Sequence, residues 1–327
     1  MHSLDHQVLA TLECWVAGGQ SAWLCTIVAT HGSSPRPAGS LMACNANGQV
    51  TGSLSGGCVE DDLLEKLRNQ HYSSFPVTVE YGLSAEDNAR VGLPCGGYLT
   101  VLVEKFTNDH LDSLRQINQA LSKRLCIKRT VDLADGSMNL DYVEGFNTLR
   151  LDSKHMVQVY GPRYSLILVG AGQIAACLAQ MASMMDYRVI VTDPRADKLD
   201  EFQSNLMGSS DEYEYIHGLP DDVVREYGND PFSIVITLTH DPRIDDMALM
   251  EALTLNNFYV GSLGSVRTTE KRIDRLRQLD LSNTQISRLH APVGLAIGSK
   301  TAPEIAVAIL AELTQLRRIQ SSQARGT

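Results

Sequence analysis

The chain has 327 residues, of which 43% are hydrophobic and 20% are charged, and its formal net charge is -10. This composition predicts a globular protein with about two compact domains. Nucleic acid is excluded as an expected partner, because binding to phosphate backbones depends on clustered lysine and arginine. The basic run Lys271–Arg277 has helical spacing, and we interpret it as a solvated helix face without a function.

Targeting signals and cysteine spacing narrow the class further. There is no apolar run of about eighteen residues, and the N-terminus lacks the basic and then apolar order of an export signal. We therefore expect a cytoplasmic protein with no membrane partner. The seven cysteines are an odd set without C-x-x-C spacing, which argues against disulfides and a thiolate zinc site. Three of them fall on apolar faces and are predicted to lie in the core: Cys14, Cys25 and Cys177.

Residues 1–160 predict an α+β domain. The expected elements in chain order are a helix at 4–17, strands at 23–30, 40–44 and 49–54, a helix at 59–70, strands at 77–81 and 98–104, and a helix at 111–123. Asn47-Gly48 predicts a hairpin between the second and third strands. Weaker strand patterns continue to Tyr160, with a turn at Asp135-Gly136.

Two glycine-rich stretches each carry a cysteine, Cys58 within 52–60 and Cys95 within 92–97. Glycine allows positive φ angles and close approach of a ligand, so each thiol is predicted to be presented to a ligand. Cys58 also lies at the start of the helix expected at 59–70, where the thiolate is favoured. The alternative for both cysteines is a small buried residue in a tight turn.

Near residue 160 the pattern changes to apolar strands alternating with helices. We expect a second domain over 161–327, with a doubly wound parallel sheet of Rossmann type. The strand at 165–169 leads into Gly170-Ala171-Gly172-Gln173 and a helix, and the next strand, at 188–192, ends in Asp193. Asp193 lies about 20 positions past the second glycine, as in the dinucleotide-binding fingerprint.

The motif alone does not identify the ligand that this domain binds. In such folds the glycines admit a pyrophosphate, the helix N-terminus binds it, and the acidic residue holds ribose hydroxyls. An NAD(P) cofactor is therefore one candidate. Arg195 either offsets a 2′-phosphate or pairs at the surface with Asp197 or Asp200.

Further strands are expected at 214–217, 233–238 and 258–260. Thr239-His240-Asp241 follows one of them, at the sheet edge where α/β proteins bind ligands. His240 either contacts a ligand or bonds to the backbone. A second phosphate cradle is predicted in the loop that carries Gly261, Ser262, Gly264 and Ser265.

Taken together, these motifs resemble the XdhC/CoxI family of accessory proteins for molybdenum hydroxylases, over nearly the whole chain. The resemblance rests on residues 30–36, 52–60, 92–97, 169–172, 239–241, 259–265, 290–295 and 304–306. Many members have histidine where this chain has Gln173 and Pro242. Those departures are similar to the PaoD-like branch, which serves aldehyde oxidoreductases, and they weigh against a His–His metal site.

The resemblance implies a maturation chaperone and not a turnover enzyme. Such a chaperone binds the molybdenum cofactor, here in its cytosine dinucleotide form, supports its sulfuration and inserts it into a xanthine dehydrogenase or aldehyde oxidoreductase apo-enzyme. The implied partners are that apo-enzyme and a cysteine desulfurase or sulfurtransferase. We also expect a homodimer, because dimers are common in such folds.

Site residues follow from the same resemblance. Soft thiolates suit the metal, so Cys95 and Cys58 are the candidates to act on it, and Cys95 is the candidate molybdenum ligand. The residues expected to line the cofactor in this half are Ser33, Ser34, Arg36, Gly56, Gly57, Gly96 and Gly97. The alternative for the first three is a polar turn fixed by prolines.

Two functions of other classes remain open beside the chaperone. One is an NAD(P)-dependent oxidoreductase that uses the Rossmann domain. The other is an inert scaffold that docks a sulfurtransferase and in which the cysteines do nothing.

Overall fold

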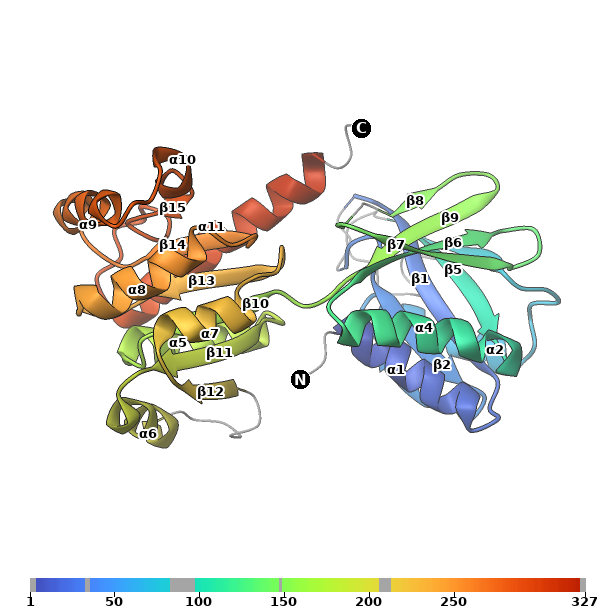
Figure 1. Cartoon of the computed structure of the whole chain (residues 1–327). Coiled ribbons are helices and arrows are strands. Elements are labelled where there is room, and N and C mark those ends of the chain that lie inside the picture. The colour runs from blue at the N-terminus through green and yellow to red at the C-terminus, as the bar shows by residue number, and fades with distance from the viewer. Residues whose placement is uncertain (1–3, 33–35, 83–97, 147–148, 206–212, 324–327) are drawn as a thin grey trace. The chain divides into compact units, whose positions relative to one another are not determined.

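The computed structural model describes residues 4–32, 36–82, 98–146, 149–205 and 213–323. The chain divides into two compact units, with Pro162 ending the N-terminal unit and Arg163 beginning the C-terminal one (Figure 1). Within the described parts, no helix combines the length and apolar character that a membrane span needs.

The N-terminal unit is built around a five-stranded sheet in which all neighbouring strands are antiparallel. Its order is β3-β2-β1-β5-β4, with β1 at Ala22–His31, β2 at Leu41–Asn45, β3 at Val50–Gly52, β4 at Val77–Tyr81 and β5 at Tyr98–Phe106. The predicted hairpin at Asn47-Gly48 is confirmed, because Gly48 N donates to the Asn45 carbonyl between β2 and β3.

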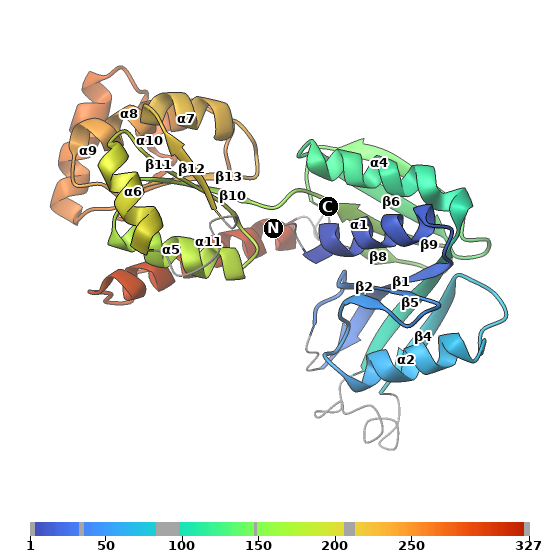
Figure 2. The same cartoon turned by 90° about the horizontal axis from the view of Figure 1, so that it is seen from below.

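Two helices cover opposite faces of this sheet (Figure 2). Helix α1, Leu4–Ala17, packs with Leu24 of β1, whereas α2, Cys58–Arg68, packs with Cys25 and Ile27 of the same strand. Successive strand residues point to opposite faces, so one strand serves both layers. The sequence predicted the start of α2 one residue too late, and Cys58 is its first residue.

A second antiparallel sheet completes the N-terminal unit. Its order is β7-β6-β9-β8, with β6 at Cys126–Asp132, β7 at Met138–Val143, β8 at Arg150–Leu151 and β9 at His155–Tyr160. A short 3-10 turn, Asn108–His110, and helix α4, Leu111–Ser122, connect the sheets. Val28 and Leu102 of the first sheet pack with Val131 and Met156 of the second.

The C-terminal unit contains a six-stranded, fully parallel sheet. Its order is β12-β11-β10-β13-β14-β15, with β10 at Ser165–Val169, β11 at Arg188–Asp193, β12 at Tyr213–His217, β13 at Ser233–Thr237, β14 at Tyr259–Ser262 and β15 at Leu289–His290. The chain starts at β10 and adds β11 and β12 toward one edge of the sheet. It then returns to β13, beside β10, and adds β14 and β15 toward the other edge. This order confirms the predicted Rossmann-type, doubly wound sheet and places its switch point between β10 and β13.

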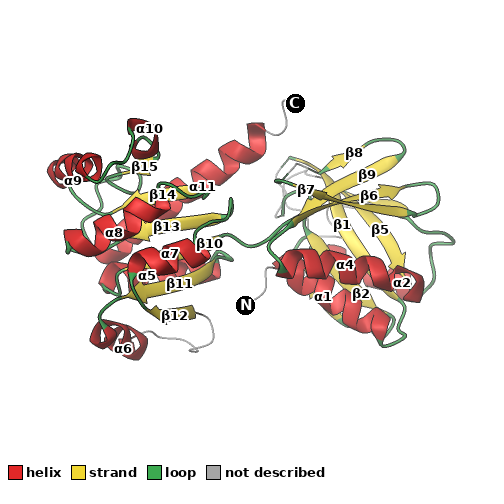
Figure 3. Ribbon diagram, viewed as in Figure 1, coloured by secondary structure: helices red, strands yellow, loops and turns green. Residues whose placement is uncertain are grey.

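Helices cover both faces of the parallel sheet (Figure 3). They are α5 at Gln173–Met184, α6 at Ala196–Asn205, α7 at Pro220–Tyr227, α8 at Pro242–Ala252, α9 at Val266–Gln278, α10 at Asn283–Ile286 and α11 at Ala302–Gln323. Figure 2 shows α5 and α11 on one side of the sheet and α7 and α8 on the other. Both faces are thereby buried, which is why every residue of β10 and β13 is buried.

The basic run in α9 corrects one expectation. Arg272 is 3% exposed instead of solvated, and its Nη2 lies 2.9 Å from a carboxylate oxygen of Asp245 in α8. Arg275 binds the neighbouring Asp246. The spacing of the basic residues reflects helical packing through buried ion pairs, so only part of the run forms a solvated face.

Candidate functional site

In the C-terminal unit, the loops after β10 and β13 meet at the switch point of the parallel sheet. Gly170 follows β10 with a φ of +110°, and a Cβ built there would lie 2.5 Å from Cγ2 of Thr239, which follows β13. Any side chain at Gly170 would therefore push the two loops apart. The close approach shapes the edge at which sheets of this kind bind ligands.

The N-terminus of α5 lies at this edge and is open. Gly172 caps the helix without a side chain and is exposed, and among the described residues no atom beyond its chain neighbours lies within 4 Å of the place where its Cβ would be. Gln173 beside it is also exposed. Helix N-termini carry partial positive charge and unpaired amides, which attract anions. The N-terminus of α5 therefore has both the space and the electrostatic potential to bind a phosphate.

Two further helices that begin at this edge, α8 and α9, supply their own caps. Asp241 caps α8 by accepting from the Arg243 amide at 3.0 Å, and hydrogen bonds from the Arg243 side chain and amide lower the pKa of Asp241 to about 2. Ser265 caps α9 by accepting from the Thr268 amide at 3.2 Å. An ionised carboxylate at α8 repels a phosphate, so α5 is the better anion site.

Asp193, the acidic residue of the fingerprint, is fully buried. One of its oxygens accepts from the Ala171 amide at 3.0 Å, and both oxygens receive the Arg195 guanidinium at 2.8 Å. Burial alone would raise the pKa of Asp193, but these hydrogen bonds hold it below its usual value. The group exposed to solvent here is Arg195, with a side chain 46% exposed, and it pairs with neither Asp197 nor Asp200.

The second phosphate cradle was predicted in a loop, but two of its four residues lie within strand β14. Gly261 and Ser262 are buried within β14, and Ser262 Oγ lies 2.5 Å from Thr237 Oγ1 of β13. A Cβ at Gly261 would lie 2.7 Å from the Tyr259 ring, so this glycine serves packing. Gly264 is partly buried, whereas Ser265 and His240 are exposed.

In the N-terminal unit, the first cysteine loop is folded around Glu60 of α2. The Glu60 carboxylate accepts six hydrogen bonds of 2.5 to 3.1 Å, from the amides of Leu54, Ser55, Gly56 and Gly57 and the hydroxyls of Ser53 and Ser55. Burial would raise the pKa of Glu60, but these bonds hold it far below its usual value. The amides of Gly56 and Gly57, two residues expected to line the cofactor, are thus already paired with this side chain.

The same loop exposes Cys58. Gly56 has a φ of +94°, which only glycine adopts readily, and Gly57 caps α2. The Cys58 side chain is exposed in the first turn of that helix. The loop therefore places the Cys58 sulfur at the surface, at the N-terminus of a helix.

Two family models match this chain. One, described as the XdhC Rossmann domain, matches residues 166–313, and one described as the XdhC and CoxI family matches residues 15–82. Together they span well over half of the sequence. The chain belongs to the XdhC/CoxI family.

This XdhC/CoxI protein is similar to relatives along most of its length. A Bacillus subtilis (strain 168) protein, named as a probable subunit of xanthine dehydrogenase, is 26% identical over 94% of this chain and 96% of its own. The molybdenum cofactor insertion chaperone PaoD of Escherichia coli (strain K12) is 24% identical over 91% and 84%. A crystal structure described as a xanthine dehydrogenase from Bacillus halodurans has a TM-score of 0.74, with 28% identity and 96% of both chains covered.

Several predicted site residues of this XdhC/CoxI protein lie outside the described residues. They are Ser33, Ser34, Cys95, Gly96 and Gly97. Arg36 is described and is partly buried. In the part of the chain that is described, no group of three or more histidine, cysteine or acidic side chains could hold a metal ion.

The cysteines predicted to lie in the core differ among themselves. Cys25 is buried as expected, and Cys177 is partly buried. Cys14 is exposed, so its prediction was wrong. Cys14 lies on α1 between Leu12 and Val16, which face the sheet, and the turn of the helix carries the cysteine to the outer side.

Sequence reasoning missed the role of three acidic groups, Glu60, Asp245 and Glu312, each of which accepts several hydrogen bonds. Glu60 had a usable signal, since a glutamate three residues after a helix cap forms the acidic half of a capping box. Asp245 and Glu312 had none, because their partners lie far along the chain. Glu312 of α11 accepts from Tyr259 Oη at 2.9 Å and pairs with His290 Nδ1 at 2.7 Å.

Proposed function

We propose that this protein is a cytoplasmic chaperone that binds the molybdenum cofactor and inserts it into a molybdenum hydroxylase of the xanthine dehydrogenase or aldehyde oxidoreductase type. The observation that carries the proposal is the exposed Cys58 at the start of α2 in a member of the XdhC/CoxI family. The similarity to PaoD, a molybdenum cofactor insertion chaperone, supports it.

The groups on each unit suit different parts of such a cargo. A soft thiolate at Cys58, and another at Cys95, would approach the molybdenum centre. The open N-terminus of α5 would bind a phosphate of an attached nucleotide, for which we propose the cytosine dinucleotide form. Gln173 and His240 are exposed near that phosphate site and would contact the nucleotide.

Partners follow from the same proposal. The chaperone would receive sulfur from a cysteine desulfurase or sulfurtransferase for the exchange of one molybdenum oxo ligand, and it would act as a homodimer. Because Glu60 already occupies the loop amides, the role left for Gly56 and Gly57 is to shape the loop that presents Cys58.

Activation of a purified apo-hydroxylase by this protein loaded with cofactor tests the proposal. We expect the natural chain to restore activity, and Cys95→Ser and Cys58→Ser to lose most of that effect. Cys14→Ser is the matched control, because Cys14 is also exposed but lies outside the glycine loops. Equal activation by all four proteins would rule out a role for the loop cysteines and favour an inert scaffold.

One observation favours a second candidate, an NAD(P)-dependent oxidoreductase: the open glycine turn before α5 is the feature that binds a pyrophosphate in such enzymes. Against it, Asp193 has no exposed surface for a ribose hydroxyl while Arg195 covers it. Titration with NADH and NADPH discriminates between the two, since only the oxidoreductase requires tight binding of either nucleotide.

A further inference from the structure

The N-terminal unit contains a cavity of about 640 Å³ that none of the preceding assignments uses. It lies at the end of the five-stranded sheet, beside the C-terminal turn of α2, and Leu64, Leu67 and Arg68 of that helix line it. Cys58 is at the opposite end of the same helix. The volume is within the range of small-molecule sites in proteins.

The floor of the cavity is a row of side chains across three neighbouring strands. Trp23 of β1 is directly opposite Cys44 of β2 on one side and Lys105 of β5 on the other, and all three line the cavity. Residues that face each other across strands point to the same face of the sheet. The Trp23 indole therefore lies between the thiol of Cys44 and the ammonium group of Lys105.

Three aromatic side chains line the cavity. Tyr72 and Phe75 line the cavity with Trp23, and their rings meet edge to face, with centroids 6.3 Å apart. Trp23 Nε1 and the Tyr72 hydroxyl are buried, and among the described residues neither has a hydrogen-bond partner. Burial, and then the charge of Asp62, raise the pKa of Tyr72 to about 12.

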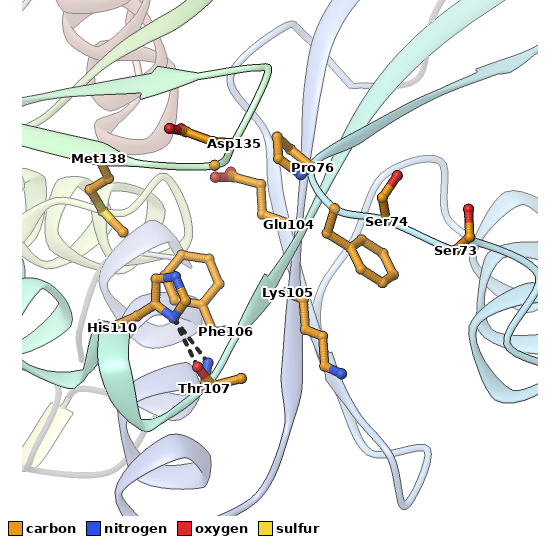
Figure 4. A pocket seen from close by; sticks show the side chains of 12 residues that line it. Ser73, Ser74, Pro76, Glu104, Lys105, Phe106, Thr107, His110, Asp135 and Met138 are labelled. Carbon is orange, nitrogen blue, oxygen red and sulfur yellow. Dashed lines mark hydrogen bonds between the residues drawn. The ribbon is translucent and has the colours of Figure 1, made fainter.

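The charge of the cavity is opposite to that of the chain. Arg68 and Lys105 line it, whereas no acidic residue is among its described lining residues, in a chain of net charge -10. Glu104, the neighbour of Lys105 on β5, binds Arg129 on the other face of the sheet. Figure 4 shows a smaller cavity that Glu104 and Lys105 both line, with the Lys105 amine directed away from Glu104.

We propose that this cavity is a binding site for a flat heteroaromatic ring that carries a phosphate, such as a nucleoside monophosphate or a pterin phosphate. The ring packs on Trp23 and Phe75, and the phosphate pairs with Arg68 and Lys105. The proposal goes beyond the chaperone function, because it concerns a site at the far end of α2 from Cys58 and requires neither molybdenum nor a hydroxylase.

The chain provides its own reporter for a test. Its two tryptophans are Trp15, on α1, and Trp23, so Trp15→Phe leaves the cavity tryptophan as the only one. Fluorescence of this variant is titrated with CMP and GMP, with cytidine and guanosine, and with inorganic phosphate. Calorimetry on the natural chain repeats these titrations and adds neopterin phosphate, so that nucleotide and pterin sources are distinguished.

We expect a nucleotide or the pterin phosphate to bind with a Kd below about 1 mM, and the nucleosides and inorganic phosphate to bind at least about tenfold more weakly. Arg68→Ala and Lys105→Ala should each weaken binding about tenfold, as loss of a charged hydrogen bond does. Lys123→Ala, which removes an exposed lysine outside the cavity, is the control and should bind normally.

Three results would overturn the proposal. The first is no fluorescence change and no heat from any probe at millimolar concentration. The second is binding of inorganic phosphate as tight as that of the nucleotides, which would remove the role of the ring. The third is normal binding in the Arg68 and Lys105 variants, with folding checked by circular dichroism.

Discussion

Glu60 holds the first cysteine loop together by hydrogen bonds from its carboxylate. Its carboxylate collects four amides and two hydroxyls from residues 53–57. Amides that point toward one place form a site for a negative charge, and here the Glu60 carboxylate supplies that charge. The exposure of Cys58 therefore depends on a side chain two positions after it.

We expect Glu60→Gln to lower the free energy of unfolding by about 1–2 kcal/mol at pH 7, because charge-assisted hydrogen bonds are replaced by neutral ones. Folding lowers the pKa of Glu60, so its contribution is complete above the ordinary glutamate pKa of about 4.3 and is lost as the pH falls further. Urea unfolding of both proteins from pH 7 to pH 3 measures this difference. A gap that stays constant over that range would show that the Glu60 charge is not what holds the loop.

The cysteines should differ in reactivity in the folded protein. Cys58 and Cys14 are exposed and should react with maleimide within minutes, whereas Cys25, Cys44 and Cys126 are buried and should react only after unfolding. Peptide mass spectrometry after a timed reaction reads each site separately. Protection of Cys58 to the level of Cys25 would contradict the loop conformation described here.

At the scale of elements, α8 and α9 are joined by a buried ion pair. Arg272 and Asp245 are 3% and 1% exposed, and Asp245 also accepts from the Thr239 hydroxyl at 2.7 Å. The pair therefore links α9 to the loop that carries His240. Burial raises the pKa of Asp245 despite these partners, which shows how far the group is removed from solvent.

Arg272→Ala should destabilise the protein by about 3–5 kcal/mol, because it leaves a buried carboxylate without its partner. Arg277→Ala is the matched control: Arg277 lies on the same helix in an exposed pair with Asp274, and its loss should cost less than about 0.5 kcal/mol. Equilibrium unfolding in urea compares the two. Similar losses for both variants would mean that the buried pair adds nothing specific.

Substitutions of Gly172 at the N-terminus of α5 should change phosphate binding without destabilising the fold. Gly172→Asp places a good capping side chain where there is open space, so the fold should be as stable or slightly more stable. The added carboxylate should repel a phosphate and abolish retention of the cofactor, whereas Gly172→Ser should retain it. Pterin content and thermal unfolding of the two variants measure both effects. Normal retention in Gly172→Asp would move the phosphate site elsewhere.

The sequence predicted the helices and strands better than it predicted the structural or binding role of individual residues. Apolar strands in alternation with helices, together with Gly170 and Gly172, were enough to predict the parallel sheet. Gly261 resembled a second phosphate cradle, because a glycine that makes room for the Tyr259 ring cannot be told from one that admits a ligand.

Long-range partners account for the remaining differences. Arg272 was interpreted as solvated because its spacing shows only its own helix, whereas its partner Asp245 belongs to another helix. The cavity beside Trp23 was not predicted, since it is formed by residues from separate strands and the end of a helix. Strand pairing that brings such residues together has no signal in local periodicity.

At the scale of the whole molecule, the chain combines two units with different chemistry. The N-terminal unit presents the Cys58 sulfur and the positively charged aromatic cavity, and the C-terminal unit presents an open helix N-terminus on a Rossmann-type sheet. A protein that only turned over a nicotinamide cofactor would need neither the exposed thiol nor its glycine loop. A chaperone for a metal-bearing pterin nucleotide would use both units.

The most direct test of this account is mass spectrometry of the small molecules released from the purified protein after expression in cells that make the molybdenum cofactor. We predict a pterin dinucleotide containing cytosine, in an amount that falls at least about tenfold in the Cys58→Ser, Cys95→Ser double variant. Protein that releases no pterin at all, or releases NAD(P) in its place, would contradict the account.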